Sequence, residues 1–268
     1  MSSYFMESAE EEIRLELKTN EESVRSHALW CGLQPGMRVL DAGCGSGKTS
    51  CILHDMAQPG GSVLGIDFSE RRVDYARKKF RRPGLDFEPH DLKKPLEGIG
   101  EFDFVWTCFV LEYFRRESQS IVDNLARCLK PGGRLCLLDL DSNMMNHYDL
   151  PKHLEKFFCG LIRKITEDHN FDPFCGRKLY SYMYDLGFEQ IRVNLVPHHL
   201  IYGEVRELDF FNWLKKVEVS AEKESGEFQK YPGGYPAFAA DFEAFFRNPR
   251  RFTYTPLVIC TGVKPLKA

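Results

Sequence analysis

A glycine-rich turn between a strand-like run and a helix-like run constrains this 268-residue chain most strongly. The strand-like run ending in Val39 and Leu40 leads into the acid Asp41; Gly43, Gly45 and Gly47 come next, and then residues 48–53, which can begin a helix. Glycines let the backbone turn sharply and let a ligand lie against it without a Cβ in the way. The free N–H groups at the start of the helix favour an anionic or electron-rich group. We therefore predict a strand, a tight loop and a helix beside a nucleotide-sized pocket.

Acidic residues close several of the strand-like runs. Asp41, Asp67 and Asp91 each close a run typical of a buried strand, and Thr107 closes a fourth. An acid at the tip of the second strand of a β-α-β unit is placed to accept hydrogen bonds from both ribose hydroxyls. Ligands in such sheets bind at the carboxyl ends of the parallel strands. We therefore expect these four residues to converge on one edge of a sheet.

Strand-like and helix-like patterns alternate from residue 37 to residue 141. Helices are predicted at 49–56, 69–80 and 118–129, and Gly-Pro turns precede the strands that follow. Such alternation implies a parallel sheet with helices on both faces and right-handed crossovers. The predicted fold class is α/β, a Rossmann-like, doubly wound, seven-stranded mixed sheet in three α/β/α layers with helical cap insertions.

The segment beyond residue 141 exceeds this minimal fold. Helices are predicted at 150–169 and 176–186, and strands at 188–195 and 252–263. The stretch between the two strands is far longer than a hairpin loop, so it must carry structure of its own. Helices are predicted within it at 205–217 and 237–246. We assign residues 1–33 to an N-terminal helical lid, 34–196 and 252–268 to the core, and 142–175 and 197–251 to the cap insertions.

The N-terminal segment, residues 4–32, has the apolar spacing of one or two amphipathic helices. Thr19-Asn20 interrupts the pattern, and Glu21-Glu22 suits the start of a second helix. These helices could only pack on the edge of the sheet. Alternatively, they form a lid in which Tyr4, Phe5 and Met6 close over a bound ligand.

The ordered motifs make residues 34–141 resemble the class I S-adenosylmethionine-dependent methyltransferases. The features that carry the resemblance are the glycine turn, the acids, the segment 102–108 and the turn Pro131-Gly132-Gly133. Less specifically, the chain resembles the small-molecule, quinone-biosynthesis-like branch. The resemblance implies S-adenosylmethionine as cofactor and S-adenosylhomocysteine as product. The cofactor-binding residues it implies are Asp41, Gly43, Gly45, Asp67, Phe68, Asp91, Leu92 and Thr107.

Roles for these residues follow from the same resemblance. Asp67 would bind the ribose, and Asp91 or the backbone at Leu92 would contact the adenine amino group. The backbone of Thr107 would contact the methionine ammonium group. The alternative for Asp67 is a surface cap for the next helix, and for Asp91 an acid that caps a turn.

Two other cofactor classes compete for the glycine turn. Residues 42–49 nearly match a P-loop, with Ala42 where the first glycine is expected. An acid at Asp41 would repel a triphosphate, however, and ATP binding leaves Asp67 and Asp91 unexplained. A dinucleotide dehydrogenase spaces its glycines as Gly-x-Gly-x-x-Gly, which differs from the spacing here.

The residues that carry catalysis are the least readable part of the sequence. Residues 106–109 lack the Asn/Asp-Pro-Pro-aromatic pattern of enzymes that methylate DNA bases or glutamine amides, which argues against those acceptors. His147 and His199 are candidate general bases, and Glu112 and Tyr113 are comparable candidates. Each of them also has an ordinary structural interpretation. The cap aromatics are more often core than pocket wall; they are Phe210, Phe211, Trp213, Tyr235, Phe238, Phe242 and Phe246.

The predicted reaction is in-line attack on the sulfonium methyl group by an O, N or C nucleophile of a small, partly apolar acceptor. Because the methyl group is already activated, the protein mainly positions the two partners and excludes water. A general base is needed only if the acceptor keeps its proton at neutral pH. Two alternatives remain open: a methyltransferase acting on protein or RNA, and a non-catalytic protein that binds S-adenosylmethionine or S-adenosylhomocysteine.

Composition limits the partners. A net charge of −3 lacks the basic excess of a dedicated nucleic-acid binder, and the basic cluster at 71–82 is interrupted by acids like a solvated helix face. No apolar run reaches the roughly 20 residues of a membrane span, and the acidic N-terminus is unlike a signal peptide. Nine cysteines without paired spacing or a CxxC motif suggest reduced thiols and no metal site. We predict a cytoplasmic protein with a small-molecule acceptor and no nucleic-acid partner.

Overall fold

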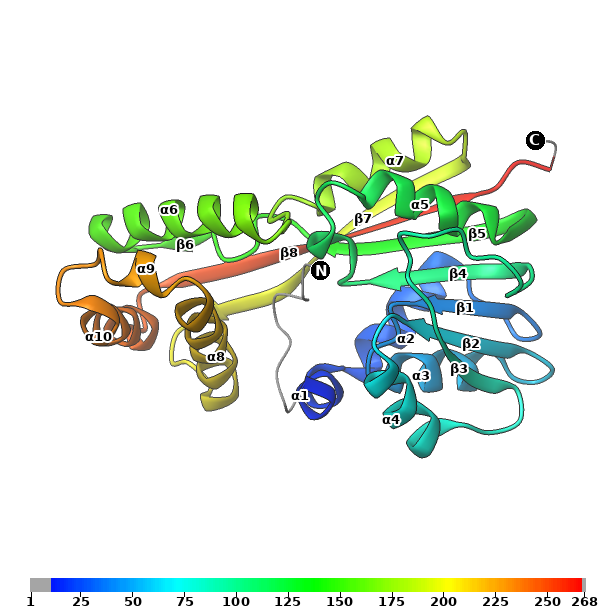
Figure 1. Cartoon of the computed structure of the whole chain (residues 1–268), viewed down its shortest axis with the longest axis horizontal. Coiled ribbons are helices and arrows are strands. Elements are labelled where there is room, and N and C mark those ends of the chain that lie inside the picture. The colour runs from blue at the N-terminus through cyan, green and yellow to red at the C-terminus, as the bar shows by residue number, and fades with distance from the viewer. Residues whose placement is uncertain (1–10, 267–268) are drawn as a thin grey trace.

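The computed structural model describes residues 11–266, which form a mixed sheet covered by helices on both faces and extended at one end into a helical cluster (Figure 1). The strands are β1 (Arg38–Ala42), β2 (Ser62–Asp67), β3 (Leu85–Pro89), β4 (Phe102–Cys108), β5 (Leu129–Leu140), β6 (His147–Tyr148), β7 (Glu189–Tyr202) and β8 (Phe252–Val263). The helices are α1 (Glu11–Lys18), α2 (Glu21–Cys31), α3 (Lys48–Ala57), α4 (Glu70–Phe80), η1 (Leu111–Tyr113), α5 (Ser118–Arg127), α6 (Lys152–Asp168), η2 (Gly176–Lys178), α7 (Leu179–Asp185), α8 (Glu207–Lys223), α9 (Ser225–Phe228) and α10 (Gly234–Arg247).

The strand order, β3-β2-β1-β4-β5-β8, is that of a doubly wound sheet whose first five strands are parallel. β8 runs antiparallel to β5 and pairs with β7 on its other side. The sheet has eight strands rather than the predicted seven. The additional strand is β6, whose two residues pair with Thr253 and Phe252 beyond the end of β5. A strand this short has no periodicity of its own, so the sequence shows only a polar loop there.

Alternate residues of the central strands pack against different helix layers. Leu40 and Ala42 belong to the cluster formed with α5 and α7, whereas Val39 belongs to the cluster formed with α2, α3 and α4. Successive side chains of a strand point to opposite faces, so a strand covered on both sides must be apolar throughout. This explains the uninterrupted apolar runs and confirms the three-layer architecture.

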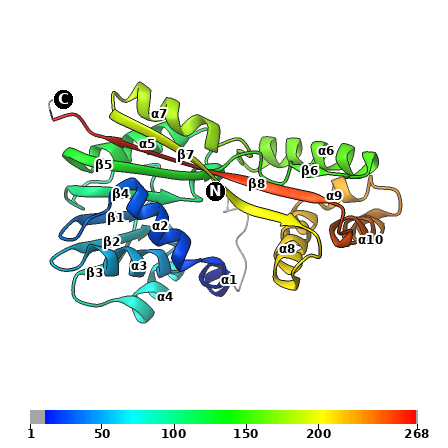
Figure 2. The ribbon, with the colours of Figure 1, turned by 180° about the vertical axis from the view of Figure 1, so that it is seen from behind.

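A long two-stranded ribbon carries the chain out of the core. β7 was predicted to end at residue 195, but it continues to Tyr202, which pairs with Phe252. The β7–β8 ribbon extends past β5, and α6, α8, α9 and α10 gather around its far end (Figures 1 and 2). We call these four helices the cap.

The cap has a hydrophobic core of its own. Five of the seven cap aromatics named above are buried in it; they are Phe210, Trp213, Phe238, Phe242 and Phe246. Phe211 is 61% exposed, and Tyr235 is partly buried at the margin of the cluster. The interpretation of these residues as core is therefore confirmed for most of them. These apolar residues form the core of the cap. A binding role for the cap therefore depends on the polar residues that lie beneath it.

The N-terminal segment forms the two predicted helices. Asn20 caps α2, because its side chain accepts a hydrogen bond of 2.9 Å from the N–H of Ser23. Gly32 ends α2 in the left-handed conformation with φ of 97°. The predicted lid residues Tyr4, Phe5 and Met6 lie outside the described residues.

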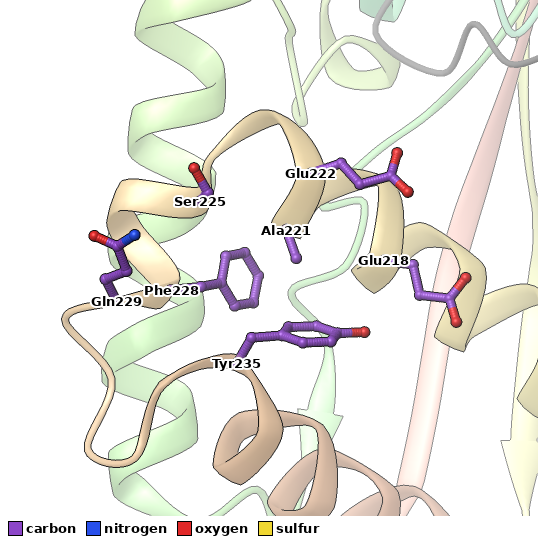
Figure 3. A pocket seen from close by; sticks show the side chains of 7 residues that line it. All are labelled: Glu218, Ala221, Glu222, Ser225, Phe228, Gln229 and Tyr235. Carbon is purple, nitrogen blue, oxygen red and sulfur yellow. The ribbon is translucent and has the colours of Figure 1, made fainter.

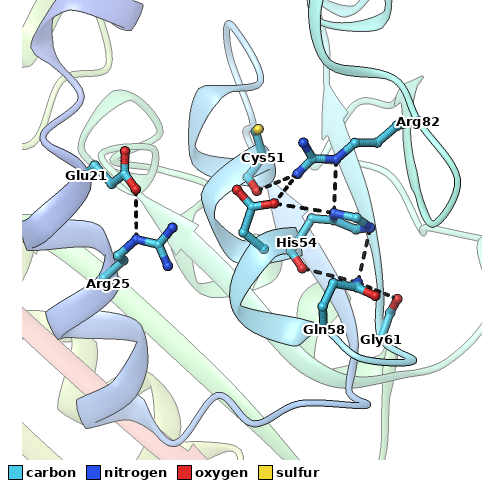
Figure 4. Close-up of polar contacts among 8 residues, drawn as sticks. Glu21, Arg25, Cys51, His54, Gln58, Gly61 and Arg82 are labelled. Carbon is cyan, nitrogen blue, oxygen red and sulfur yellow. Dashed lines mark hydrogen bonds and ion pairs between the residues drawn. The ribbon is translucent and has the colours of Figure 1, made fainter.

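The basic cluster at 71–82 is divided among separate ion pairs. Arg82 contacts Asp55 and His54 of α3, a network drawn in Figure 4 with Gln58 and Gly61. Arg81 pairs with Asp86 at 3.0 Å. Pairing of these cations with acids reduces the positive charge that the cluster could offer to a nucleic acid. No helix within residues 11–266 has the length and apolarity to cross a membrane.

Candidate active site

The glycine turn lies between the carboxyl ends of β1 and β2. The N–H groups of Gly43 and Cys44 donate to the carbonyl of Ile66 at 2.8 and 2.9 Å. Gly43 has φ of +84°, and a Cβ on it would lie 2.3 Å from Cγ2 of Val110, just after β4. Only glycine satisfies both conditions, so the backbone of this turn can approach a ligand closely. The predicted convergence of β1, β2 and β4 on one edge is present in the structure.

Asp67, the predicted ribose ligand, is buried at the tip of β2. Its carboxylate accepts hydrogen bonds from the N–H of Gly45 at 3.0 Å and of Ser69 at 2.9 Å. The guanidinium of Arg72 pairs with the same carboxylate at 3.0 Å. Arg72 was interpreted as part of a solvated helix face, and this is wrong, because only 4% of it is exposed. The first turn of α4 instead points this side chain at Asp67.

Asp41 is buried at the end of β1 and accepts a hydrogen bond of 2.6 Å from the Ser50 hydroxyl of α3. Burial raises the pKa of Asp41 to about 7, the Ser50 bond opposes the rise, and nearby Asp67 adds to it. The acid therefore titrates near neutral pH in the free protein. A cationic ligand group nearby would favour its ionised form.

The other predicted cofactor residues surround this edge in different environments. Phe68 is 56% exposed beside Arg72, so its ring is available to stack on a planar group. Asp91 caps a turn by accepting the N–H of Lys93 at 3.1 Å, as the alternative interpretation predicted. Leu92 is buried. Thr107 is buried in β4, and among residues 11–266 its hydroxyl has no hydrogen-bond partner.

Helix α1 covers the glycine turn. Cδ1 of Leu15 lies 3.0 Å from the position of a Cβ on Gly45. Glu16 anchors the helix to α4, accepting hydrogen bonds from Tyr75 at 2.8 Å and from Lys79 at 2.6 Å. These bonds lower the pKa of Glu16. Lys48, the lysine that a P-loop would use for phosphate, donates to the backbone carbonyl of Glu16 at 3.5 Å. An anchored helix over the turn is the position that a lid requires.

This cradle fits a nucleoside ligand attached to an amino-acid chain. The glycines of the turn have positive φ, one buried acid lies at the tip of β2, and an exposed aromatic ring follows it. Residues 40–137 match the family described as "Methyltransferase domain". Residues 40–137 are a class I methyltransferase domain. Such domains use S-adenosylmethionine, so the predicted recognition and cofactor are confirmed for this part of the chain.

Known proteins support both the sequence resemblance and the fold. A ubiquinone biosynthesis O-methyltransferase of Dechloromonas aromatica is 37% identical over 111 residues, which is 40% of this chain and 46% of that protein. A putative methyltransferase from Bacillus halodurans has a similar structure, with a TM-score of 0.60 at 16% identity over 91% of this chain and 99% of that one. The [4+2]-cyclase SpnF has a TM-score of 0.57 at 20% identity over 92% and 82% of the two chains. At these identities the structural likeness concerns the fold alone.

The similarity is confined to part of the chain. This protein spans about half the length of the curated relatives it matches, 46% and 49% in two of them. The segment that the family model matches, residues 40–137, ends before the first helix of the cap, α6. The acceptor side has to be argued from the structure.

A second group of polar residues lies between the methyltransferase domain and the cap. Glu112 of η1 is 2% exposed and accepts a hydrogen bond of 3.0 Å from the side chain of Asn143. The N–H of Glu112 donates to Asp139 at 3.1 Å. Burial raises the pKa of both carboxyls, and each is further affected by nearby charges. The phenylalanine at the end of β4, Phe109, has φ of +58°, a strained backbone conformation for a non-glycine residue.

The two histidines predicted as bases occupy different surroundings. Both ring nitrogens of His147 have partners, Thr253 at 2.9 Å and the carbonyl of Met144 at 3.3 Å. Burial among the cap aromatics lowers its pKa to about 4. This geometry favours a structural role for His147. His199 instead lies beside Trp213, with ring centroids 5.5 Å apart, and its Nδ1 has no partner among the described residues.

Two residues of this region were missed by the sequence reasoning, Asn143 and Lys216. His198 packs against Phe109 with ring centroids 4.8 Å apart. Lys216 follows Trp213 by three positions on α8, so it lies beside the apolar stripe of the helix. A lysine three residues after a buried tryptophan on a predicted helix was the sequence signal that could have identified it. Asn143 sits in a loop and gave none.

Two hollows in the surface lie away from this region. One, of about 530 Å³, is lined by Glu218, Phe228 and Tyr235 between α8, α9 and α10 (Figure 3). The other, of about 610 Å³, lies at the opposite edge of the sheet from the glycine turn, around Ser62 and Arg82. Within the described part of the chain, no group of three or more His, Cys, Asp or Glu side chains could hold a metal ion.

Proposed function

We propose that the whole chain is an S-adenosylmethionine-dependent methyltransferase that methylates a small acceptor held between the methyltransferase domain and the cap. One observation carries this proposal. The buried polar group around Glu112 begins at the end of β4, next to the glycine turn, and is enclosed by β7 and α8. Beside the glycine turn there is thus a group of buried polar atoms between the methyltransferase domain and the cap, formed by Glu112, Asn143, His198, His199 and Lys216, which we call the chamber.

In the proposed reaction the chain mainly binds, orients and excludes water. S-adenosylmethionine supplies an already activated methyl group. Asp67 would hold the ribose, and Asp41, ionised by a neighbouring cation, would favour the amino end of the cofactor. Leu15 of α1 would exclude water from above the turn. Residues from β7, η1 and α8 would hold the acceptor.

The first experiment is a thermal shift of the purified chain with S-adenosylhomocysteine, with Mg²⁺-ATP and NAD as controls. Ligand at about 100 times its dissociation constant stabilises a protein by about 2.7 kcal/mol, which is several degrees for a chain of this size. The expected result is a shift with S-adenosylhomocysteine alone. A shift with Mg²⁺-ATP alone would overturn the proposal and assign Lys48 to phosphate.

A second experiment separates the proposal from its alternatives. The chain is incubated with labelled S-adenosylmethionine and either a small-molecule extract or a protein and RNA fraction. Label in a small-molecule product supports the proposed acceptor class. Label in protein or RNA would instead identify a macromolecular acceptor, and binding without transfer to any fraction would indicate a non-catalytic binder.

A further inference from the structure

Unpartnered polar atoms gather in the chamber between the methyltransferase domain and the cap. Nζ of Lys216, Nε2 of His198, Nδ1 of His199 and Oδ1 of Asn143 are all buried, and none has a hydrogen-bond partner among residues 11–266. A buried polar group without a partner costs about 1–3 kcal/mol, so most proteins keep very few of them. Four in one chamber indicate that this surface is built to bind something polar.

Several of these groups lie next to one another in a row of contacts. His198 lies 4.8 Å from the ring of Phe109 and 4.3 Å from the ring of His199, measured between centroids. His199 packs on Trp213, and Nζ of Lys216 lies 4.8 Å from the centre of the Trp213 ring. A continuous path of contacts therefore runs from the end of β4, across β7, to α8.

The chamber is richer in positive than in negative charge. Lys18 lies over the ring of Phe109, at 5.1 Å, and with Arg14 it lowers the pKa of Lys216. Glu112 is the facing carboxyl that raises it, but one of its oxygens is bonded to Asn143. No hydrogen bond joins Lys216 to an acid within the described residues. Among residues 11–266 the ammonium group therefore has no hydrogen-bonded counter-ion.

We propose that Lys216 binds an ionised oxygen of the acceptor, a carboxylate or a phenolate, with His198 and His199 as neighbouring hydrogen-bonding groups. The inference rests on the proposed function, because it assigns a chemical class to the acceptor of that same site. An anionic oxygen supplies the missing partner of a buried ammonium, and such charge-assisted bonds are about twice as strong as neutral ones. The planar groups around it, Phe109 and Trp213, suit an aromatic or otherwise flat acid.

The charge state of Lys216 gives this binding a pH dependence. The pKa of Lys216 is lowered to about 7. Burial is the main cause, Lys18 and Arg14 contribute to the lowering, and Glu112 opposes it. His198 and His199 also face the chamber, and burial lowers the pKa of both, so they are neutral at pH 7. As pH rises above 7, Lys216 loses its proton. The affinity for a carboxylate should then fall, approaching about tenfold per pH unit.

The experiment uses the full chain with saturating S-adenosylhomocysteine and small probes of defined charge. Benzoate and 4-nitrophenolate are the ionised probes, and benzamide is the uncharged control. Binding is measured by tryptophan fluorescence and by thermal shift. We expect the ionised probes to bind and benzamide to bind at least about tenfold more weakly. A difference between benzoate and 4-nitrophenolate identifies the kind of oxygen. Equal binding of benzamide, or no binding of either anion, would overturn the proposal.

The matched variants are Lys216→Met and Lys215→Met, neighbouring residues of α8. Lys215 pairs with Glu218 at 3.1 Å. Lys216→Met should lose benzoate binding by at least about tenfold, yet keep the shift with S-adenosylhomocysteine. It should also melt at a higher temperature when free, because a buried ammonium group is removed. Lys215→Met should behave as the wild type. Retained benzoate binding in Lys216→Met contradicts the assignment.

Failure of this inference is distinguishable from failure of the proposed function. The titration with benzoate is repeated without S-adenosylhomocysteine. If S-adenosylhomocysteine produces no shift but benzoate binds and depends on Lys216, the anion site is present and the proposed function is wrong. If S-adenosylhomocysteine produces a shift and benzoate binds independently of Lys216, the methyltransferase proposal survives and this inference fails.

Discussion

The carboxylate of Asp67 and the ammonium nitrogen of Lys216 are both buried, but the protein surrounds them differently. Asp67 accepts hydrogen bonds from two backbone N–H groups and from Arg72. Lys216 donates none within the described residues, and burial lowers its pKa to about 7. The cofactor side is thus held in one geometry by the protein itself. On the acceptor side, several buried polar atoms have no hydrogen-bond partner within the described residues, and a bound ligand would supply one.

This difference explains why the cofactor side could be predicted from the sequence and the acceptor side could not. A backbone turn that needs glycine at a positive φ leaves a motif in the sequence. An unpartnered polar atom leaves no motif, because it is defined by what surrounds it in space. The variants that follow each change a residue of the cofactor side or of the cap, and each is compared with a matched control variant.

The largest effect is expected at the glycine turn. Gly43→Ala adds a Cβ 2.3 Å from Val110 to a backbone with φ of +84°. The left-handed conformation costs about 1–2 kcal/mol and the overlap about 1–3 more, so unfolding in urea should show a loss of about 2–5 kcal/mol. Gly98→Ala is the matched control, with φ of +80° and no atom near its Cβ. It should lose only the conformational part, and an equal loss in both would contradict the close approach of Val110.

The cap should be the more acid-sensitive side. The folded-state pKa of His147 is lowered to about 4, whereas an unfolded histidine has about 6.5. The unfolded chain therefore binds more protons between these values, so stability falls as pH drops from 6.5 to 4. We expect a loss of about 2 kcal/mol between pH 7 and pH 5 in urea titrations. His147→Asn should remove this contribution, while that of His198 and His199 remains. His153→Asn, at an exposed position, should not. The same slope in both variants would refute the assignment.

Asp67→Asn should weaken cofactor binding without touching the chamber. Asparagine can still accept the Gly45 N–H, but the charge that would hold the ribose and Arg72 is gone. Loss of charge-assisted bonds worth about 1.5–3 kcal/mol predicts a 10- to 100-fold weaker affinity for S-adenosylhomocysteine by calorimetry. Asp86→Asn removes an exposed ion pair with Arg81 and should leave that affinity unchanged. A wild-type affinity in Asp67→Asn would place the ribose elsewhere.

The smallest effect is expected at α1. Glu16→Ala removes the acceptor of Tyr75 and Lys79, a contact at the surface worth no more than about 1 kcal/mol. The loosened helix should admit S-adenosylhomocysteine a few times faster in stopped-flow experiments. Glu21→Ala breaks the exposed pair with Arg25 on α2 (Figure 4) and is the control. An unchanged association rate in Glu16→Ala would show that α1 does not gate the turn.

Much of the fold followed from the sequence because its signals are local. The glycine turn, the acids at the strand ends and the bounds of β8 at Phe252–Val263 were predicted and are observed. The short β6 was not, since two residues carry no period and only their pairing with β8 defines them. The length of β7 was underestimated because its outer half pairs with β8 alone, beyond the core sheet.

The candidate site was predictable in proportion to how far each role depends on neighbours along the chain. Asp41 and Asp67 were found from their positions after apolar runs. Arg72 was misplaced because its burial depends on how the first turn of α4 meets β2. Lys216 was missed because its surroundings come from η1, β7 and α1, segments far apart in the sequence.

The ribbon of β7 and β8 has a mechanical consequence. β7 and β8 pair from Tyr202 and Phe252 beneath the cap to Glu189 and Val263 in the core, with irregularities in register at Glu189–Arg192 and Pro197–His199. A regular ladder resists bending, so a movement of the cap relative to the core would be concentrated at the irregularity at Pro197–His199. His198 and His199 lie at this point, and such a movement would shift them relative to Phe109 and Trp213.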